Sequence, residues 1–160
     1  MNNCSEYVLD DMVAITAIPI DDYEAIGSTS LEPTIKAADF APSLINAIVV
    51  GIYPAEAGGV VIPIVKSTGK VKDSESKNVA GRSHNVNVEC DIDDRDASLW
   101  PVIVNLERNA YHLLLTLRDG TRTFVQATED SYMCTSERGS GKTSLTFKVH
   151  NMMGMQLIVE

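Results

Sequence analysis

The sequence has few cysteines and no long apolar run, and both absences exclude classes of protein. Its three cysteines, Cys4, Cys90 and Cys134, are an odd number with no Cys-x-x-Cys spacing, which argues against a disulfide framework and a zinc site. The longest apolar runs, residues 47–52 and 60–65, fall far short of the roughly 18 residues that a membrane-spanning helix needs. The first residues also lack the basic and apolar regions of a secretory signal. We therefore expect a soluble, cytoplasmic protein without membrane insertion.

Basic residues are scarce as well. Lysine and arginine number 13 against 22 aspartates and glutamates, which gives a formal net charge of -9. A surface of this sign repels the phosphates of nucleic acids, so the composition argues against a nucleic-acid-binding protein. With 160 residues, 44% of them apolar, the chain can bury one core and leaves little room for a second. We expect a single domain over residues 1–160, with residues 1–10 as a candidate N-terminal arm.

Short β-strands dominate the pattern of the chain. Segment 84–92 alternates most clearly, which predicts one buried face and one wet, acidic face. Pro19 and Pro63 are each expected at a strand end or on a sheet edge, because proline cannot donate to the ladder. Between residues 31 and 57 we expect only a helical turn over 35–40 and a strand over 47–53. The strands expected elsewhere span residues 12–20, 60–66, 84–92, 111–118, 121–128, 131–136, 144–150 and 155–159.

One segment carries the spacing of an amphipathic helix. Ser98 is a suitable N-cap, and Pro101 in the first turn gives up an N–H that would have no partner within the helix. A stripe of apolar residues at helical spacing predicts a helix over residues 98–109 that packs on a sheet. The stripe consists of Leu99, Val102, Ile103, Leu106 and Ala110.

A polar segment separates two of the expected strands. Residues 67–83 turn to Lys, Ser, Asp, Glu, Asn and Gly, a composition that is typical of an exposed loop. A loop of this length within a compact domain is usually functional or disordered. We therefore predict a long exposed loop over residues 67–83.

The strongest turn signal is Asp119-Gly120, which lies between two apolar segments. A two-residue turn predicts a hairpin that pairs Leu114 with Val125 and Thr116 with Thr123. Large apolar side chains then occupy both faces of this hairpin, although an antiparallel sheet in a monomer usually leaves one face polar. The helix can cover one face, and we expect another subunit to cover the rest.

Segment Gly139–Ser144 ends like a phosphate-binding loop. The motif needs a glycine where Ser136 stands, and it needs a helix that begins at Lys142. Residues 144–150 alternate like a strand instead. The preferred interpretation is a hairpin tip, and a small phosphate- or nucleotide-binding enzyme that uses Gly139–Ser144 is kept as an alternative function.

Other polar clusters lack the residues that a metal site or a catalytic site requires. The acidic run over residues 91–96 begins like a calcium loop, but Arg95, Asp96 and Val102 occupy positions that need other residues. A strand-to-helix connection is the better interpretation. The three histidines, at positions 84, 112 and 150, lie in separate strand-like segments, with no i, i+4 pair among them and no Ser or Cys in a nucleophile-elbow setting. We predict no enzyme activity, no catalytic residues, no cofactor and no metal.

The second half of the sequence resembles the small structural proteins of bacteriophage tails, in particular tail tube proteins and their neighbours at the tube ends. The resemblance covers about residues 58–160 and rests on four parts: a strand pair with a long polar loop, the single helix, the hairpin sequence that begins Tyr111-His-Leu-Leu-Leu-Thr-Leu, and the closing segment that begins Lys142-Thr-Ser-Leu-Thr-Phe. It implies a mainly β (α+β) domain: an antiparallel β-sandwich or barrel-like fold with one packed helix and a long inter-strand loop. It further implies rings, typically hexameric, that stack into a conduit for DNA.

Assembly then assigns candidate roles to particular residues. An acidic wall would let DNA slide without binding, and we place three residues of segment 84–92 there. Loop 67–83 is long enough to reach a neighbouring subunit or ring. The methionines near the C-terminus are suited to a subunit contact or, equally, to the core. The candidate lumen residues are Asn87, Glu89 and Asp91; the candidate interface residues are Lys70, Lys72, Asp73, Leu114, Thr116, Val125, Met152, Met153 and Met155.

The expected partners are further copies of this chain, other phage tail proteins, and DNA that passes without specific binding. The expected location is the tail of the virion, assembled in the cytoplasm of a bacterial host. A tail terminator, a head–tail connector or a baseplate component is the closest alternative, since these proteins share the fold. A small β-rich ligand-binding module is an alternative of another class.

Overall fold

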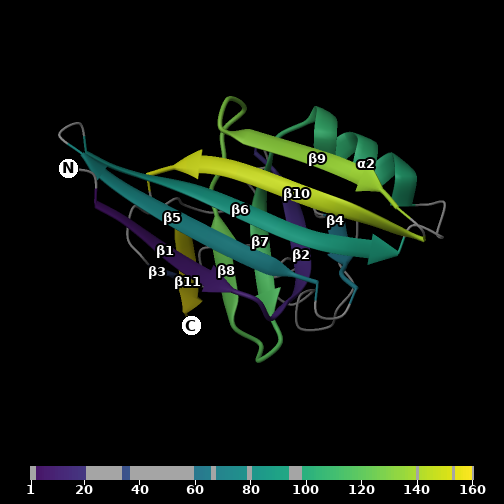
Figure 1. The fold of residues 1–160 in the computed structure, drawn as a ribbon, viewed down its shortest axis with the longest axis horizontal. Coiled ribbons are helices and arrows are strands. Elements are labelled where there is room, and N and C mark those ends of the chain that lie inside the picture. Colours follow the sequence, from purple (N-terminus) through teal and green to yellow (C-terminus); the bar gives the residue numbers. More distant parts are fainter. Residues whose placement is uncertain are drawn as a thin grey trace.

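The computed structural model describes residues 3–20, 34–36, 60–65, 68–78, 81–93, 99–139, 141–152 and 154–159. Within these ranges the chain is mainly β, with two sheets and one α-helix (Figure 1). The mainly β class with a single packed helix is therefore confirmed for the described part of the chain.

The first sheet has five strands and is antiparallel throughout. Its long central strands alternate between apolar and polar residues, as a sheet with one buried face requires. The order is β1 (Asn3–Leu9), β5 (Lys70–Asn78), β6 (Gly81–Asp93), β10 (Lys142–Asn151) and β9 (Tyr132–Arg138).

The second sheet has six strands and is antiparallel except for the pair β11–β3. Pro19 is the last residue of its strand and Pro63 lies in an edge strand, as predicted. The helical turn over residues 35–40 is wrong where it can be compared, because Ile35 lies in a strand; the strand over 47–53 falls outside the described residues. The order is β3 (Thr34–Lys36), β11 (Met155–Val159), β8 (Arg122–Val125), β7 (Tyr111–Leu117), β2 (Met12–Pro19) and β4 (Val60–Pro63).

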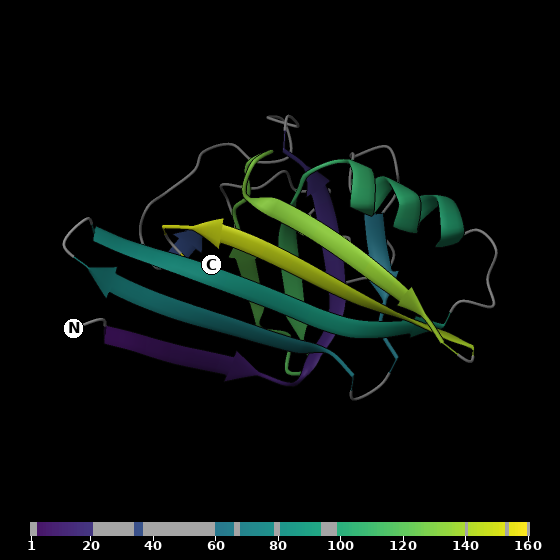
Figure 2. The ribbon, with the colours of Figure 1, turned by 45° about the horizontal axis from the view of Figure 1, so that its top comes forward.

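The main apolar core lies between the two sheets, whose strands cross steeply (Figures 1 and 2). Alternate residues of β6, from Val86 to Ile92, and the residues Leu113, Leu115 and Leu117 of β7 belong to one buried cluster. Each fully buried aliphatic side chain of this kind contributes roughly 1.5–3 kcal/mol. The predicted inward face of residues 84–92 is therefore confirmed.

Helix α2 (Leu99–Arg108) lies along β9, at one side of the core (Figure 1). Its residues Ile103 and Leu106 are buried in the main cluster, as the apolar stripe predicted. The Tyr132 hydroxyl of β9 donates a hydrogen bond of 2.8 Å to the carbonyl of Leu106, which fixes the last turn of the helix to the sheet.

The long loop predicted over residues 67–83 is wrong, because β5 and the first residues of β6 form a hairpin there. Outward positions such as Lys70 and Lys72 are exposed to solvent, so their polarity is that of a wet sheet face. Inward positions are polar too, because Asp73 and His84 pair with each other instead of joining the apolar core. Residues 1–10 also contain a strand, since β1 pairs with β5 along its whole length.

The β7–β8 hairpin forms with a loop of three residues, Arg118-Asp119-Gly120, and not with the predicted two-residue turn. The Leu117 N–H donates to the Thr121 carbonyl at 2.8 Å, and Gly120 adopts a φ of 91°. A glycine at the third position of such a loop is typical of a type I turn followed by a bulge. The register therefore shifts by one residue, and Leu114 pairs with Phe124 instead of Val125.

Candidate assembly surface

The outer face of the five-stranded sheet is polar across its central strands. Strand alternation turns the buried side chains of β5, β6 and β10 to the core and the intervening side chains outward. The outward residues are Lys70, Lys72, Asn85, Asn87, Glu89, Asp91, Ser144, Thr146, Lys148 and His150. A broad, wet sheet face is thus available to solvent or to a partner.

Asn87, Glu89 and Asp91 lie together on this face, as the alternation predicted. The face is nevertheless not an acidic wall. In the register Lys70 pairs with Glu89, and Asn87 lies between Lys72 and Lys148. These lysines belong to β5 and β10, so the sequence of β6 alone does not predict them. Directly opposite side chains in a sheet lie roughly 5 Å apart, so Lys70 lies close to Glu89, and Lys72 and Lys148 both lie close to Asn87.

Hydrogen bonds between neighbouring strands tie several of these polar side chains together. The Ser144 hydroxyl donates to Asp91 Oδ1 at 2.7 Å, and His150 Nδ1 lies 2.8 Å from Asn85 Oδ1. These contacts join β10 to β6 on the outer side. These hydrogen bonds fix the orientation of the side chains that they join, which favours a rigid surface over an adaptable binding site.

The two edges of this sheet expose apolar side chains that the sequence analysis missed. Tyr7 and Val8 of β1 are 60% and 55% exposed, and Met133 of β9 is 56% exposed. Val8 and Met133 stand at opposite ends of one row across the outer face. The row runs Val8, Lys72, Asn87, Lys148, Met133.

The β9 edge is partly covered and the β1 edge is more open. Ser136 donates a hydrogen bond to Glu107 of α2, and the Arg138 guanidinium lies 4.9 Å from the centre of the Trp100 ring. Among the described strands, none pairs with the outer edge of β1. Open edges carry unpaired backbone groups and are natural places for another chain to add a strand.

The hairpin residues predicted as a subunit interface are inside the single chain. Leu114 and Val125 are both 0% exposed, and Thr116 is half-buried. Val125 belongs to the core between the sheets, and Leu114 is buried with Phe124 on the opposite face. Both faces of the hairpin are therefore covered without a partner, which corrects the expectation that another subunit covers one of them.

The remaining predicted interface residues are either exposed, packed inside the chain or outside the described residues. Lys70 and Lys72 are exposed on the outer face, whereas Asp73 is buried on the inner face beside His84. Met152 is exposed in the turn between β10 and β11, and Met155 packs against the core. Met153 lies outside the described residues.

The described residues of segment Gly139–Ser144 lie at the end of the β9–β10 hairpin and in the start of β10, which agrees with the interpretation as a hairpin tip. The Gly139 N–H donates to the Lys142 carbonyl at 2.7 Å, and Gly141 has a φ of 75°. Strand β10 begins at Lys142, so no helix N-terminus stands where a phosphate-binding loop needs one. The tip lacks the geometry on which the nucleotide hypothesis depends.

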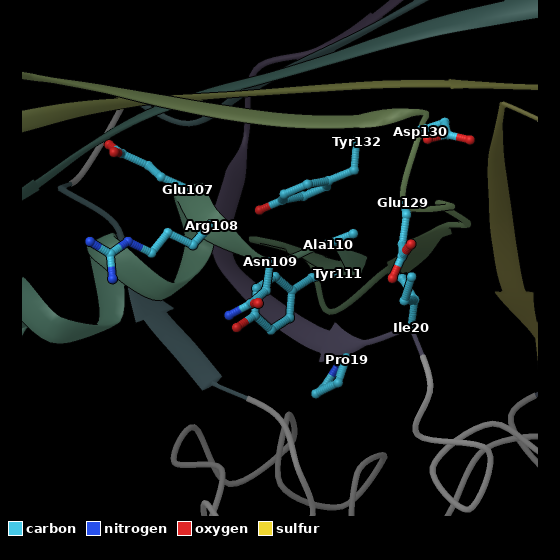
Figure 3. A pocket seen from close by; sticks show the side chains of 10 residues that line it. All are labelled: Pro19, Ile20, Glu107, Arg108, Asn109, Ala110, Tyr111, Glu129, Asp130 and Tyr132. Atoms are coloured by element: carbon cyan, nitrogen blue, oxygen red, sulfur yellow. The ribbon is translucent and has the colours of Figure 1, made fainter.

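A cavity of about 900 Å³ lies where β2 and α2 end and β7 begins (Figure 3). The rings of Tyr111 and Tyr132 lie 6.0 Å apart beside it, and burial raises the pKa of Tyr132. Its described lining contains no histidine, cysteine or serine. The lining residues are Pro19, Ile20, Glu107, Arg108, Asn109, Ala110, Tyr111, Glu129, Asp130 and Tyr132.

Other chemistry on the described residues is limited. No group of three or more His, Cys, Asp or Glu side chains among them is arranged to hold a metal ion, and no helix in these ranges is long and apolar enough to cross a membrane. Burial raises the pKa of the Cys90 and Cys134 thiols to about 12, which keeps both in the unreactive thiol form.

Comparison with protein-family models, with curated proteins and with solved structures gave no match. A functional conclusion for this chain therefore rests on its own sequence pattern and geometry. The feature with the clearest geometry is the polar face of the five-stranded sheet with its apolar edges.

Proposed function

We propose that this protein is a virion structural subunit with a β-sandwich fold that assembles into rings, and that the rings stack as the tail tube of a bacteriophage. The observation that carries the proposal is the five-stranded sheet, which combines a polar outer face with exposed apolar side chains at both edges. Joining edges would bury Val8 and Met133 and extend the sheet from subunit to subunit.

The two edges of the five-stranded sheet are different strands, so copies can join head to tail as well as through a two-fold contact. Five strands that alternate in direction leave β1 and β9 parallel to each other at opposite edges (Figure 1). Pairing β9 of one copy with β1 of the next joins two different surfaces, and a head-to-tail contact of this kind closes into a ring when the rotation permits. Pairing β1 with its own copy would instead give a two-fold dimer.

The outer face would then line the conduit. Lys70 pairs with Glu89 on it, whereas the row around Asn87 holds two lysines, Lys72 and Lys148, and no carboxylate. The chain as a whole has a net charge of -9. Such a wall carries Lys70, Lys72 and Lys148 together with Glu89 and Asp91, so charges of both signs would face the DNA, which is consistent with passage of DNA without tight binding.

A tail terminator, a head–tail connector and a baseplate component remain within the proposal as alternatives, because these proteins share the fold. Other tail proteins would be the partners at the two ends.

Electron microscopy and analytical ultracentrifugation of the purified full chain test the proposal. Rings or tubes are expected for the wild type, and monomers for Val8→Lys combined with Met133→Lys, because two charges then enter the junction. Val13→Lys is the matched control, since Val13 is an exposed valine of the six-stranded sheet. A wild-type protein that stays monomeric at high concentration, or edge variants that still form rings, would contradict the proposal.

A further inference from the structure

The cavity of about 900 Å³ at the end of α2 combines a buried aromatic floor with an exposed polar rim (Figure 3). Tyr111, which is 9% exposed, and the partly buried Tyr132 form the floor, and their rings meet edge to face with centroids 6.0 Å apart. Glu107, Asn109 and Glu129 on the rim are exposed to solvent. Cavities of about 300–1,000 Å³ are typical of sites for small molecules. The cavity therefore has the size and the access that a small ligand needs.

A buried hydroxyl in this cavity lacks a partner. Within the described part of the chain, no group forms a hydrogen bond with the Tyr111 hydroxyl, although the side chain is buried. The Tyr132 hydroxyl donates its proton to the Leu106 carbonyl at 2.8 Å, so its oxygen is left as an acceptor. A buried polar group without a partner costs free energy, which a ligand in the cavity would offset. The floor thus offers two hydroxyl oxygens to a hydrogen-bond donor.

The charges around the cavity favour a cation. Its described lining carries three carboxylates, those of Glu107, Glu129 and Asp130, and one guanidinium, that of Arg108. Figure 3 shows the Arg108 side chain extending away from both tyrosine rings. The cavity also lies where α2 ends, and the C-terminal end of a helix carries partial negative charge and carbonyls without partners in the helix. A positively charged ligand would therefore be attracted to this cavity.

An organic cation fits the lining better than a metal ion does. No group of three or more His, Cys, Asp or Glu side chains among the described residues is arranged to hold a metal. Tyrosine rings attract organic cations through their faces. A primary ammonium group also carries three N–H donors and no acceptor, which matches hydroxyl and carboxylate oxygens. A quaternary ammonium group would leave these oxygens without a donor.

We propose that this cavity binds a small organic cation through a primary ammonium group. The ammonium group donates hydrogen bonds to the Tyr111 hydroxyl oxygen and to the Glu129 carboxylate, and the ring of Tyr132 stabilises its charge. All of these groups belong to one chain. The site therefore does not depend on whether the subunit assembles into rings.

Calorimetric titration of the full-length protein with 1,4-diaminobutane tests the proposal. The ionic strength is held constant, so that general screening of the charge does not change during the titration. We expect saturable binding with one site per chain. The matched control ligand is 1,4-butanediol, which has the same carbon chain and no charge, and it should not bind. Absence of saturable diamine binding, or equal binding of the diol, would overturn the proposal.

Variants locate the site. Glu129→Gln should weaken diamine binding about tenfold or more, because a hydrogen bond between two charged groups is lost. Tyr111→Phe keeps the ring and should weaken binding about threefold to tenfold through loss of the hydroxyl. Glu137→Gln is the matched control: it removes the same charge from an exposed residue of β9 that does not line the cavity. Its affinity should stay within about twofold of the wild type.

The control also distinguishes a site from general attraction. The chain has a net charge of -9, so cations gather near its surface without a defined site. Equal losses of affinity in Glu129→Gln and Glu137→Gln would mean such general attraction and would contradict the proposal. Unchanged affinity in Glu129→Gln would contradict it as well. Circular dichroism confirms that each variant folds, and the comparison of diamine with diol on the wild type decides if a variant does not fold.

Discussion

The two sheets of this protein differ in what their second faces meet. The centre of the six-stranded sheet is buried on both sides: Leu113 and Leu115 face the main core, while Leu114 and Phe124 are fully buried on the opposite face. The five-stranded sheet buries one face and leaves the other polar and wet. The six-stranded sheet therefore provides stability, and the five-stranded sheet presents a surface.

Shortening a buried leucine side chain of β7 should have the largest effect on the free energy of unfolding. Leu114→Ala and Leu115→Ala should each lower the free energy of unfolding by about 2–5 kcal/mol, because each leaves a cavity in a fully buried site. Urea denaturation measures both. If Leu114→Ala cost less than about 1 kcal/mol, in the range of an exposed position, the second face would not be a true core.

Acid should weaken the six-stranded sheet through His112. Burial lowers the pKa of His112 to about 4, although a hydrogen bond with the Ile20 backbone opposes the shift; its Nδ1 accepts the Ala127 N–H at 2.9 Å. The unfolded chain, with a histidine pKa near 6.5, binds this proton more tightly. Stability is therefore fully present above about pH 6.5 and is lost towards pH 4, by at most about 3 kcal/mol.

The measurement is urea denaturation of the wild type and His112→Gln at several pH values. In His112→Gln the free energy of unfolding should fall less steeply between about pH 6.5 and 4, because the contribution of the His112 ring is absent. His150→Gln, which changes an exposed histidine, should keep the wild-type slope. Identical slopes in the wild type and His112→Gln would mean that this ring does not resist protonation.

A substitution in the β7–β8 turn should lower the free energy of unfolding less than these changes do. Gly120→Ala should cost roughly 1 kcal/mol, because a φ of 91° strains any residue with a Cβ even though the space around Gly120 is open. Gly139→Ala is the control in another hairpin, where the added Cβ makes only an ordinary contact with the Lys142 carbonyl. Thermal unfolding distinguishes the two, and equal costs would contradict a three-residue loop closed by Gly120.

A substitution on the outer face of the five-stranded sheet should have the smallest effect on the free energy of unfolding. Lys148→Ala should change the free energy of unfolding by no more than about 0.5 kcal/mol, because its side chain lies on the wet side of β10. Urea denaturation measures this as well. A loss of several kcal/mol would show that the polar face is part of the core and would remove the contrast between the sheets.

Periodicity predicted much of the fold. The alternation over residues 84–92 and the helical stripe ending at Leu106 each report one buried face directly, and both were correct. The hairpin register was wrong by one residue because Asp119-Gly120 fits both a two-residue turn and the end of a three-residue loop. The prediction for segment 67–83 was wrong because polar residues replace apolar ones at inward positions of β5, where Asp73 pairs with His84 of β6.

The candidate surface was harder to predict than the fold. A sequence shows that Leu114 is apolar but not what covers it, so the interface predicted at Leu114 is wrong and the residue is buried within one chain. Val8 and Met133 become edge residues only through the order of strands that are distant in the chain. The lysines beside Asn87 come from β5 and β10, and only the register brings them together.

The two buried thiols have a consequence for the protein's chemical lifetime. Cys90 and Cys134 lie on the inner face of the five-stranded sheet, on either side of β10, and both stay protonated. Oxidants attack thiolates that they can reach, so neither sulfur is a ready target. Transfer from a reducing to an oxidising medium should leave both side chains covalently unchanged.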